Sequence, residues 1–182
     1  MNKKIAIFCG ARSGRESHYV QMAKDVANIL AQNNIDLVFG GGKVGLMGVL
    51  ADSILSLGGN AYGVIPKLLV DKEVAHTELT ELFIVPSMHE RKKKIYDLAD
   101  SFLVLPGGLG TLDEMFEILT WAQLGLHQKK CGLYNYNGFY NGLITHLDFF
   151  AKEGFDSNTS PAQQKLFFWD SNLPLLMNKI LS

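Results

Sequence analysis

The feature that most constrains the fold of this chain is a repeated alternation of short apolar runs with amphipathic stretches of helical period. Several of the runs are apolar on both faces, as the strands of a sheet covered on two sides must be. The runs are "KIAIFCG", "IDLVFGG", "NAYGVIP", "LFIVP", "SFLVLPGG" and "KKCGLYN". The remaining segments predict helices near 16–32, 44–57, 88–99, 111–125, 138–152 and 172–181.

Strands that alternate with helices favour right-handed βαβ crossovers, because parallel neighbours need a long connection. The sequence therefore predicts an α/β fold, a single Rossmann-like doubly wound domain over residues 1–182 with a mainly parallel sheet flanked by helices. No internal repeat, low-complexity tract or Pro/Ser-rich linker divides the sequence.

Charge and cysteine content restrict the possible partners. The formal net charge is −1, from 17 Lys and Arg against 18 Asp and Glu, so no global field favours a nucleic acid or a membrane. The first apolar run is too short for a signal peptide or a membrane span. The two cysteines, Cys9 and Cys131, lie in apolar runs without metal-ligand spacing. We therefore expect buried thiols, no metal site and a cytoplasmic location.

Three glycine-rich segments, "CGARSG", "GGGKVGLMG" and "PGGLGT", sit where predicted strands end. Any one of them is consistent with a simple tight turn, but together they favour a phosphate-bearing ligand, which needs close backbone approach. The second segment matches G-x-G-x-x-G at Gly40, Gly42 and Gly45. The following strand lacks the acid that an NAD ribose requires, and the terminal Lys-Ser/Thr of a P-loop is missing. These observations predict a phosphate ligand and no dinucleotide cofactor.

The helix that opens with "SMHERKKKIYDLAD" has a charged interruption in its apolar stripe, at Arg91 and Lys92. Arg91 can snorkel at the first helical turn, with its stem on the apolar face and its charge in water. Alternatively, it points into the cleft at the strand ends, where its rigid fork grips a phosphate or a carboxylate. We favour the cleft.

The next helix carries a polar stripe, Glu114, Glu117 and Thr120, on an otherwise apolar segment. One interpretation is a capping box, Thr111-x-x-Glu114, that closes the helix start. That interpretation explains neither Glu117 nor an arginine directed towards the same strand end. Because residues 115–124 are apolar almost all round, we also expect this helix to be buried in a two-fold interface, which predicts a homodimer.

Two motifs carry a family resemblance. "PGGLGTLDE" (Pro106–Glu114) and "MHERK" (Met88–Lys92) resemble the signatures PGGxGTxxE and MHxRK of the LONELY GUY (LOG) family, the cytokinin riboside 5′-monophosphate phosphoribohydrolases. The resemblance extends from "IFCG" to about Gly154. It implies hydrolysis of an N6-substituted adenosine 5′-monophosphate, and of AMP, to the free base and ribose 5-phosphate. It requires no metal and no cofactor, and its small-molecule partner is a nucleoside 5′-monophosphate.

By matching position, the resemblance makes Arg91 and Glu114 the catalytic residues. The substrate-binding residues expected from the resemblance and from the glycine-rich strand ends are Gly10, Ser13, Gly41, Gly42, Glu73, Met88, Arg91, Lys92, Gly107, Gly108, Leu109, Gly110, Thr111, Leu112, Asp113, Glu114, Glu117 and Thr120. The first loop departs from the family, because "CGARSG" replaces the common Cys-Gly-Ser-Ser and leaves Ser13 as its one hydroxyl. Both core motifs are intact.

This assignment explains why carboxylates stand beside a phosphate-binding turn. Backbone N–H groups of Gly107–Thr111 hold the phosphate, while Glu114 faces the ribose, where positive charge develops in an oxocarbenium-like transition state. The alternatives are a non-catalytic nucleotide or anion carrier, which typically lacks the Arg/Glu pair, and a PLP-dependent lysine decarboxylase, for which no Schiff-base lysine is marked. An NAD oxidoreductase is disfavoured by the missing ribose acid. The physiological nucleotide stays open.

Overall fold

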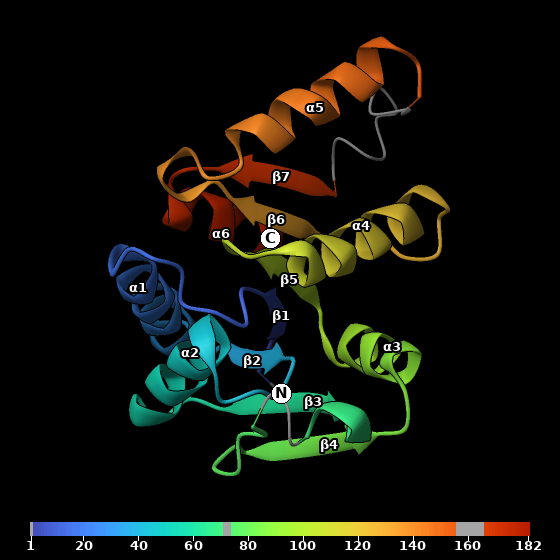
Figure 1. Ribbon diagram of the computed structural model, residues 1–182. Coiled ribbons are helices and arrows are strands. Elements are labelled where there is room, and N and C mark those ends of the chain that lie inside the picture. The colour runs from blue at the N-terminus through green and yellow to red at the C-terminus, as the bar shows by residue number, and fades with distance from the viewer. Residues whose placement is uncertain (1, 71–73, 156–165) are drawn as a thin grey trace.

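In the computed structural model, seven strands form one sheet in the order β4-β3-β2-β1-β5-β6-β7, with helices on both sides (Figure 1). The structure describes residues 2–70, 74–155 and 166–182. The strands are β1 (Lys4–Phe8), β2 (Asp36–Phe39), β3 (Ala61–Pro66), β4 (Glu81–Val85), β5 (Ser101–Val104), β6 (Cys131–Tyr134) and β7 (Phe167–Asp170). The α-helices are α1 (His18–Gln32), α2 (Gly45–Ser56), α3 (Met88–Leu98), α4 (Leu109–Gln123), α5 (Asn141–Lys152) and α6 (Leu173–Leu181). All neighbouring strands pair in parallel, which confirms the predicted doubly wound α/β fold.

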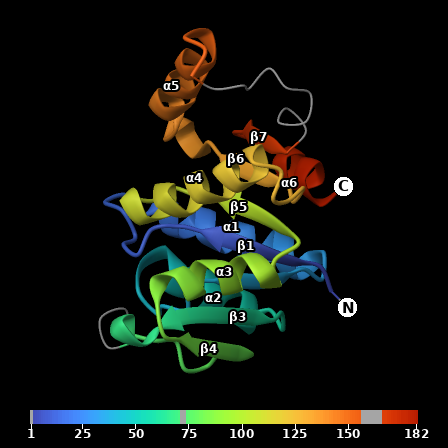
Figure 2. The ribbon, with the colours of Figure 1, turned by 90° about the vertical axis from the view of Figure 1, so that its right-hand side faces the viewer.

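Two hydrophobic layers cover the two faces of the sheet. Helices α1 and α2 lie on one side of the sheet and α3 and α4 on the other (Figure 1), and Figure 2 looks onto the face that α3 and α4 cover. Side chains alternate along a strand, so Ile5 and Ile7 of β1 enter the layer under α1, α2 and α6, whereas Ala6 and Phe8 enter the layer under α3 and α4. All four are at most 4% exposed. Burial on both faces is the reason that the central strands read as continuous apolar runs.

Strand β7 is absent from the sequence prediction, although its "FFWD" has the aromatic composition typical of strands. It pairs with β6 at the edge of the sheet. The predicted helix boundaries lie within one helical turn of those observed. The difference in helix boundaries that matters most for the site is at α4, which begins at Leu109 rather than at Thr111.

The strand order creates a switch point between β1 and β5, because the chain proceeds from β1 towards one edge of the sheet and returns to begin the other half at β5. Loops after such strands diverge and leave a crevice at their carboxyl ends. The two loops meet at one backbone hydrogen bond, in which Gly10 N–H donates to the Pro106 carbonyl over 3.2 Å. Two of the three predicted glycine-rich segments thus lie side by side.

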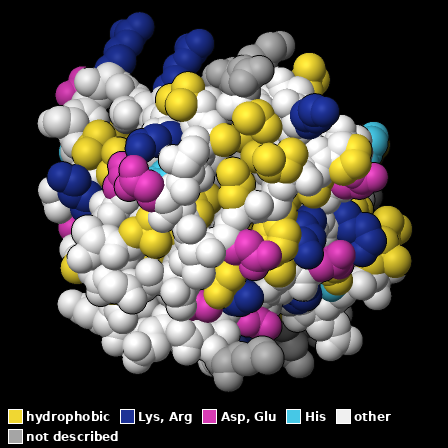
Figure 3. Space-filling view, turned by 90° about the horizontal axis from the view of Figure 1, so that it is seen from below, with side chains coloured by type: hydrophobic (Ala, Val, Ile, Leu, Met, Phe, Trp, Pro, Cys, Tyr) yellow, Lys and Arg dark blue, Asp and Glu magenta, His cyan; other side chains and the backbone are white. Residues whose placement is uncertain are grey.

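The face of the molecule on the side of β4 carries no dominant charge (Figure 3). Seen from the side of β4, positive and negative side chains mix with hydrophobic ones (Figure 3), as the net charge of −1 leads one to expect. None of the helices in the described ranges combines the length and apolar character that crossing a bilayer requires. An anionic ligand must therefore be held by a local arrangement of groups.

Candidate active site

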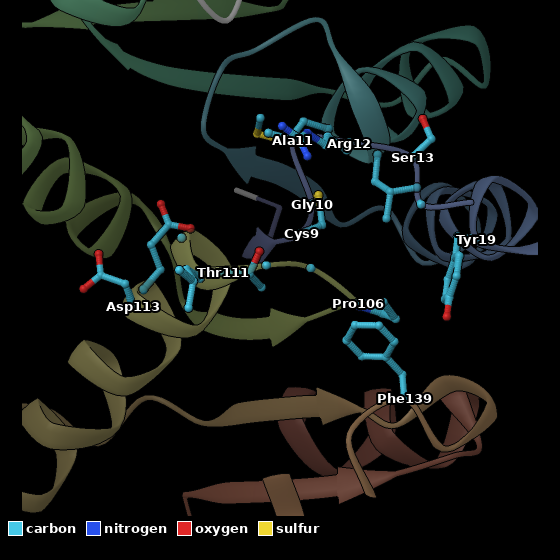
Figure 4. Close-up of a pocket in the computed structure, with 18 of the residues that line it drawn as sticks. Cys9, Gly10, Ala11, Arg12, Ser13, Tyr19, Pro106, Thr111, Asp113 and Phe139 are labelled. Carbon is cyan, nitrogen blue, oxygen red and sulfur yellow. The ribbon is translucent and has the colours of Figure 1, made fainter. Parts of the chain in front are cut away.

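A cavity of about 620 Å³ opens at the β1/β5 switch point (Figure 4). It is formed by the loops after β1 and β5 and by the first turns of α2, α3 and α4. Its lining comprises Cys9, Gly10, Ala11, Arg12, Ser13, Gly14, Tyr19, Leu46, Met47, Met88, Arg91, Pro106, Gly107, Gly108, Leu109, Gly110, Thr111, Asp113, Glu114 and Phe139. Most of one wall is therefore the turn that leads into α4.

The start of α4 is an anion-binding site by its geometry. Gly108 is the N-cap residue and no side chain caps the helix. The first intrahelical bond runs from the Leu112 N–H to the Gly108 carbonyl over 3.2 Å, so the preceding N–H groups point out of the helix end. Gly107 permits this tight entry, because a β-carbon there would stand 2.1 Å from Thr111 Oγ1. The residues that carry these amide groups, Gly108 to Thr111, line the cavity.

The capping-box interpretation of Glu114 is wrong. A capping box needs Thr111 at the N-cap, but Thr111 lies inside α4 and is buried at 4% exposure. β5 ends at Val104, and α4 begins directly after the second glycine of the turn, Gly108, which is its N-cap. The carboxylate of Glu114 therefore needs another explanation than the closing of the helix start.

Arg91 is buried at 6% exposure and directed at the strand ends rather than at water. Its Nε donates to the Val64 carbonyl over 3.2 Å, and its Nη2 donates to the Gly40 carbonyl over 3.1 Å. Helix α3 supports this placement, since its N-cap Ser87 accepts a hydrogen bond from the Glu90 N–H over 3.3 Å. The snorkelling alternative is thus excluded, and the guanidinium is fixed at the cavity wall.

Glu114 lines the cavity from the second turn of α4 and is close enough to Cys9, the residue after β1, to act on it electrostatically. Burial raises the pKa of the Cys9 thiol far above its ordinary value, and the Glu114 charge raises that pKa further. Because the thiolate is the nucleophilic form of cysteine, Cys9 stays a neutral thiol in the wall of the cavity. Glu114 is thus one of two acids of the lining, with Asp113, and the one that lies close to Cys9.

Lys92 turns away from the cavity. Its Nζ lies 2.8 Å from Asp113 Oδ2 and 3.3 Å from Glu117 Oε2, so it joins α3 to α4. Burial lowers the pKa of Lys92, but the hydrogen bonds and charges of the two carboxylates outweigh burial and hold the pKa above its ordinary value. Lys92 is a permanent cation between the two helices.

The structure brings together most of the residues expected from the sequence. Those that line the cavity are Gly10, Ser13, Met88, Arg91, Gly107, Gly108, Leu109, Gly110, Thr111, Asp113 and Glu114. Lys92, Leu112, Glu117, Thr120, Gly41 and Gly42 lie outside its lining. Glu73 falls outside the described residues.

Each residue outside the lining has a local reason for its place. Leu112 packs against the core beneath α4, and Thr120 is exposed further along that helix. Gly41 and Gly42 are buried under a strap, in which the His76 N–H donates to the Gly41 carbonyl over 2.9 Å and Ala75 bridges to Gly42. As contacts of a nucleotide these residues stay predictions.

Sequence reasoning missed the aromatic end of the cavity. Tyr19 from α1 and Phe139 from the loop before α5 face each other edge to face, with ring centroids 5.9 Å apart (Figure 4). Figure 4 shows them at the opposite end from Asp113. Arg12 of the first loop also lines the cavity. The "CGARSG" loop was a usable signal for Arg12, whereas Tyr19 and Phe139 come from segments without a motif.

The donor set of the cavity suits an organic anion. Among the described residues, no three His, Cys, Asp or Glu side chains gather into a metal-binding group. No lysine belongs to the lining given above, so this part of the structure offers no amine for a Schiff base. The lining instead combines free helix amides, a fixed arginine and a carboxylate, which are groups for binding and hydrolysing a phosphorylated molecule.

Comparison with known proteins shows extensive sequence similarity. Residues 47–177 match a family model described as "Possible lysine decarboxylase". The cytokinin riboside 5′-monophosphate phosphoribohydrolase LOG5 of Arabidopsis thaliana is 40% identical over 178 residues, covering 98% of this chain and 77% of that protein. The cytokinin riboside 5′-monophosphate phosphoribohydrolase of Rhodococcoides fascians is 46% identical over 154 residues, covering 84% and 78%.

Solved structures of the same fold are more distant in sequence. The molybdenum cofactor binding protein of Rippkaea orientalis superposes with a TM-score of 0.71 at 16% identity, over 100% of this chain and 99% of that one. The Moco carrier protein of Chlamydomonas reinhardtii gives a TM-score of 0.70 at 15% identity, over 100% and 98%. These two establish the fold. The sequence relatives establish the family, and this chain belongs to the LONELY GUY (LOG) family.

Proposed function

We propose that this protein hydrolyses the N-glycosidic bond of adenosine 5′-monophosphates, preferentially N6-substituted ones, and releases the free base and ribose 5-phosphate. The observation that carries the proposal is that one cavity holds three groups: the open N-terminus of α4, a guanidinium fixed by backbone carbonyls, and Glu114. The sequence relatives are named for this reaction on cytokinin nucleotides.

Binding begins at the phosphate. The N–H groups of the Gly107–Thr111 turn and the positive end of the α4 dipole hold the 5′-phosphate. A nucleotide held there extends its ribose along the first turns of α4, where Glu114 is. Arg91 balances the negative charge of phosphate and carboxylate and orients the nucleotide between them.

During hydrolysis, positive charge develops on the ribose, where the carboxylate of Glu114 can stabilise it. As the C1′–N9 bond breaks, its electron pair goes to the base and C1′ becomes cationic. The carboxylate stabilises this cation more than the neutral ground state, which lowers the barrier. The oxygen of a water bonds to C1′. One of its protons remains on the new hydroxyl and the other ends on the base, with Glu114 placed to accept it first.

Product analysis over a panel of nucleoside monophosphates tests the proposal. The purified protein is incubated with AMP, N6-isopentenyl-AMP, GMP and CMP, and free base is separated by chromatography. We expect base release from AMP-type substrates in equal amount to ribose 5-phosphate. Nucleotide binding without base release makes the protein a carrier, and CO₂ release from lysine in the presence of PLP makes it a decarboxylase.

We also propose a homodimer formed through α4. Three large apolar side chains lie on or next to this helix and are 65–87% exposed: Leu109, Leu124 and Leu126. Phe116 and Trp121 are only partly buried by the core below. Helices that are apolar beyond the stripe facing their own sheet bury the remainder against a partner.

Sedimentation at micromolar concentration tests the assembly. We expect twice the 20.2 kDa chain mass for the unaltered protein. Leu124→Lys introduces a charge into the proposed interface and shifts the equilibrium to monomer. Leu68→Lys is the matched control, because Leu68 is similarly exposed at 71% but lies beyond β3, away from α4. A monomer for the unaltered protein contradicts the proposal.

A cytoplasmic location is a further part of the proposal. Both cysteines are free and buried, which fits a reducing compartment. Cell fractionation followed by immunoblotting tests this location, and recovery of the protein from a membrane or secreted fraction contradicts it.

A further inference from the structure

Two pairs of adjacent charged residues face each other across the α3–α4 junction. Arg91 and Lys92 are neighbours on α3, and Asp113 and Glu114 are neighbours on α4. Neighbouring residues on a helix point about 100° apart. Arg91, Asp113 and Glu114 line the cavity, whereas Lys92 lies outside its lining and meets Asp113 at 2.8 Å.

The Lys92 contact is a partly desolvated triad rather than a surface pair. Lys92 Nζ also lies 3.3 Å from Glu117 Oε2, and the side chains of Lys92 and Glu117 are only 15% and 24% exposed. The neighbouring Lys93 pairs with Asp97 at 2.8 Å on the same helix, but there the exposures are 69% and 46%. The third member, Asp113, is 62% exposed, so it is the contact between Lys92 and Glu117 that solvent and salt screen much less than the Lys93 pair.

The triad addresses an electrostatic problem in the first turns of α4. Asp113, Glu114 and Glu117 all lie within five consecutive positions, beside the turn where a phosphate binds. Uncompensated carboxylates this close disfavour one another's ionised form and repel the bound phosphate. Lys92 places one positive charge between two of the three, at Asp113 and Glu117.

We propose that Lys92 is a positioning residue for the hydrolytic reaction: it neutralises Asp113 and Glu117, so that Glu114 stays ionised in the presence of the substrate phosphate. The inference rests on the proposed function, because it assigns Lys92 a role in the ionisation of the carboxylate that faces the ribose. Lys92 acts through the acids of α4 and not by touching the nucleotide.

Several charged and titratable groups surround Glu114, and the test changes only members of the Lys92 triad. Cys9 faces it from the end of β1 and remains a neutral thiol. The charged groups of the remaining cavity wall and of the junction are Arg12, Arg91, Lys92, Asp113 and Glu117. Only the last three form the triad, so variants within it isolate its contribution.

The pH dependence of kcat at saturating AMP tests the inference, because kcat reports ionisations in the enzyme–substrate complex. Lys92→Met keeps the length of the side chain and removes its charge. We expect the acid limb of kcat to move to higher pH by about half a unit, since losing a nearby cation raises a carboxyl pKa. Glu117→Gln removes a nearby anion and is expected to move the limb to lower pH by about the same amount. The double variant returns the limb close to its original position.

Lys93→Met is the matched control, because it removes the same charge from the solvent-facing pair on the same helix. It shows how far the loss of one lysine charge from α3 moves the limb when the triad is intact. Melting curves confirm that each variant is folded. Glu117→Gln, on the outer side of the triad, keeps the inference testable if Lys92→Met does not fold.

Three results overturn the inference. If the acid limbs of the kcat–pH profiles coincide for all variants, Lys92 has only a packing role. Limbs that move in the same direction for both single variants contradict charge compensation. A rise in KM for AMP that adenosine does not share, without a moved limb, makes Lys92 a ligand of the phosphate. If the unaltered protein releases no base, the proposed function fails instead, and the two failures are distinguishable.

Discussion

Arg91 occupies space that only glycine leaves open at position 40. A β-carbon on Gly40 would stand 2.0 Å from Arg91 Nη2, the nitrogen that donates to the Gly40 carbonyl. The second glycine-rich segment, which resembles a dinucleotide motif in the sequence, therefore accommodates a side chain of the protein at this glycine. The functional group at this glycine is therefore the Arg91 guanidinium and not a bound dinucleotide.

Gly40→Ala is expected to displace the Arg91 guanidinium and to lower kcat at least tenfold. A shift of about 1 Å in the position of a catalytic group is enough to slow a reaction strongly. Base release from AMP is the measurement. Gly142→Ala on α5 is the control, since a β-carbon there meets nothing within 4 Å. Gly40→Ala with unchanged kcat shows that the observed position of Arg91 is not needed for turnover.

Glu114→Gln is expected to lower kcat for AMP by about a hundredfold or more, because it removes negative charge where C1′ becomes cationic. A melting curve is expected to show that the variant stays folded, because Gln keeps the size and shape of the Glu side chain. Glu153→Gln, at the exposed end of α5, controls for the loss of one carboxylate. A folded Glu114→Gln protein with near-normal turnover removes Glu114 from the mechanism.

Adenosine, which lacks the 5′-phosphate, is expected to have a kcat/KM about a hundredfold or more below that of AMP. Several charge-assisted hydrogen bonds at the α4 N-terminus are lost together, at a cost of roughly 3 kcal/mol. Initial rates of adenine release from the two compounds measure the ratio. Equal values for nucleoside and nucleotide contradict phosphate binding at the Gly107–Thr111 turn.

Both thiols are expected to be unreactive in the folded protein at pH 8. Burial raises the pKa of Cys131 to about 12, and burial together with the charge of Glu114 raises the pKa of Cys9 above its ordinary range. A chromogenic disulfide reagent measures free thiolate, and it should titrate two thiols only after unfolding. Rapid reaction of one thiol in the folded state, abolished by Cys9→Ser, contradicts the neutral state of Cys9.

The sequence was sufficient for the parts of the fold and site that depend on local patterns. Buried parallel strands are apolar on both faces, so six of the seven strands could be recognised as apolar runs in the sequence. The end of the run that forms β5 also located the glycine-rich turn that follows it. Arg91 stood out because a charge interrupted an apolar helical stripe. Its true direction, onto the carbonyls of Gly40 and Val64, agrees with that interpretation.

Features that depend on packing between distant segments were not predictable in this way. Tyr19 and Phe139 belong to segments that meet only in the folded chain, and neither carries a motif. The partner of Lys92 was equally hidden, because its ion pairs depend on the distance between α3 and α4. Thr111 misled the capping argument, since a glycine at the N-cap let the helix start earlier.

The hydrogen bond between Gly10 and Pro106 also bears on how the protein matures. A chain emerging from the ribosome delivers β1 to β4 and Arg91 first, while the edge of β1 that will receive β5 is still unpaired. Once β5 has emerged it can pair with β1, and the cavity is complete only when α4 and the segment through Phe139 have followed. The cavity therefore depends on segments from both halves of the sheet, and fragments that stop before β5 are expected to leave the β1 edge unpaired and prone to aggregation.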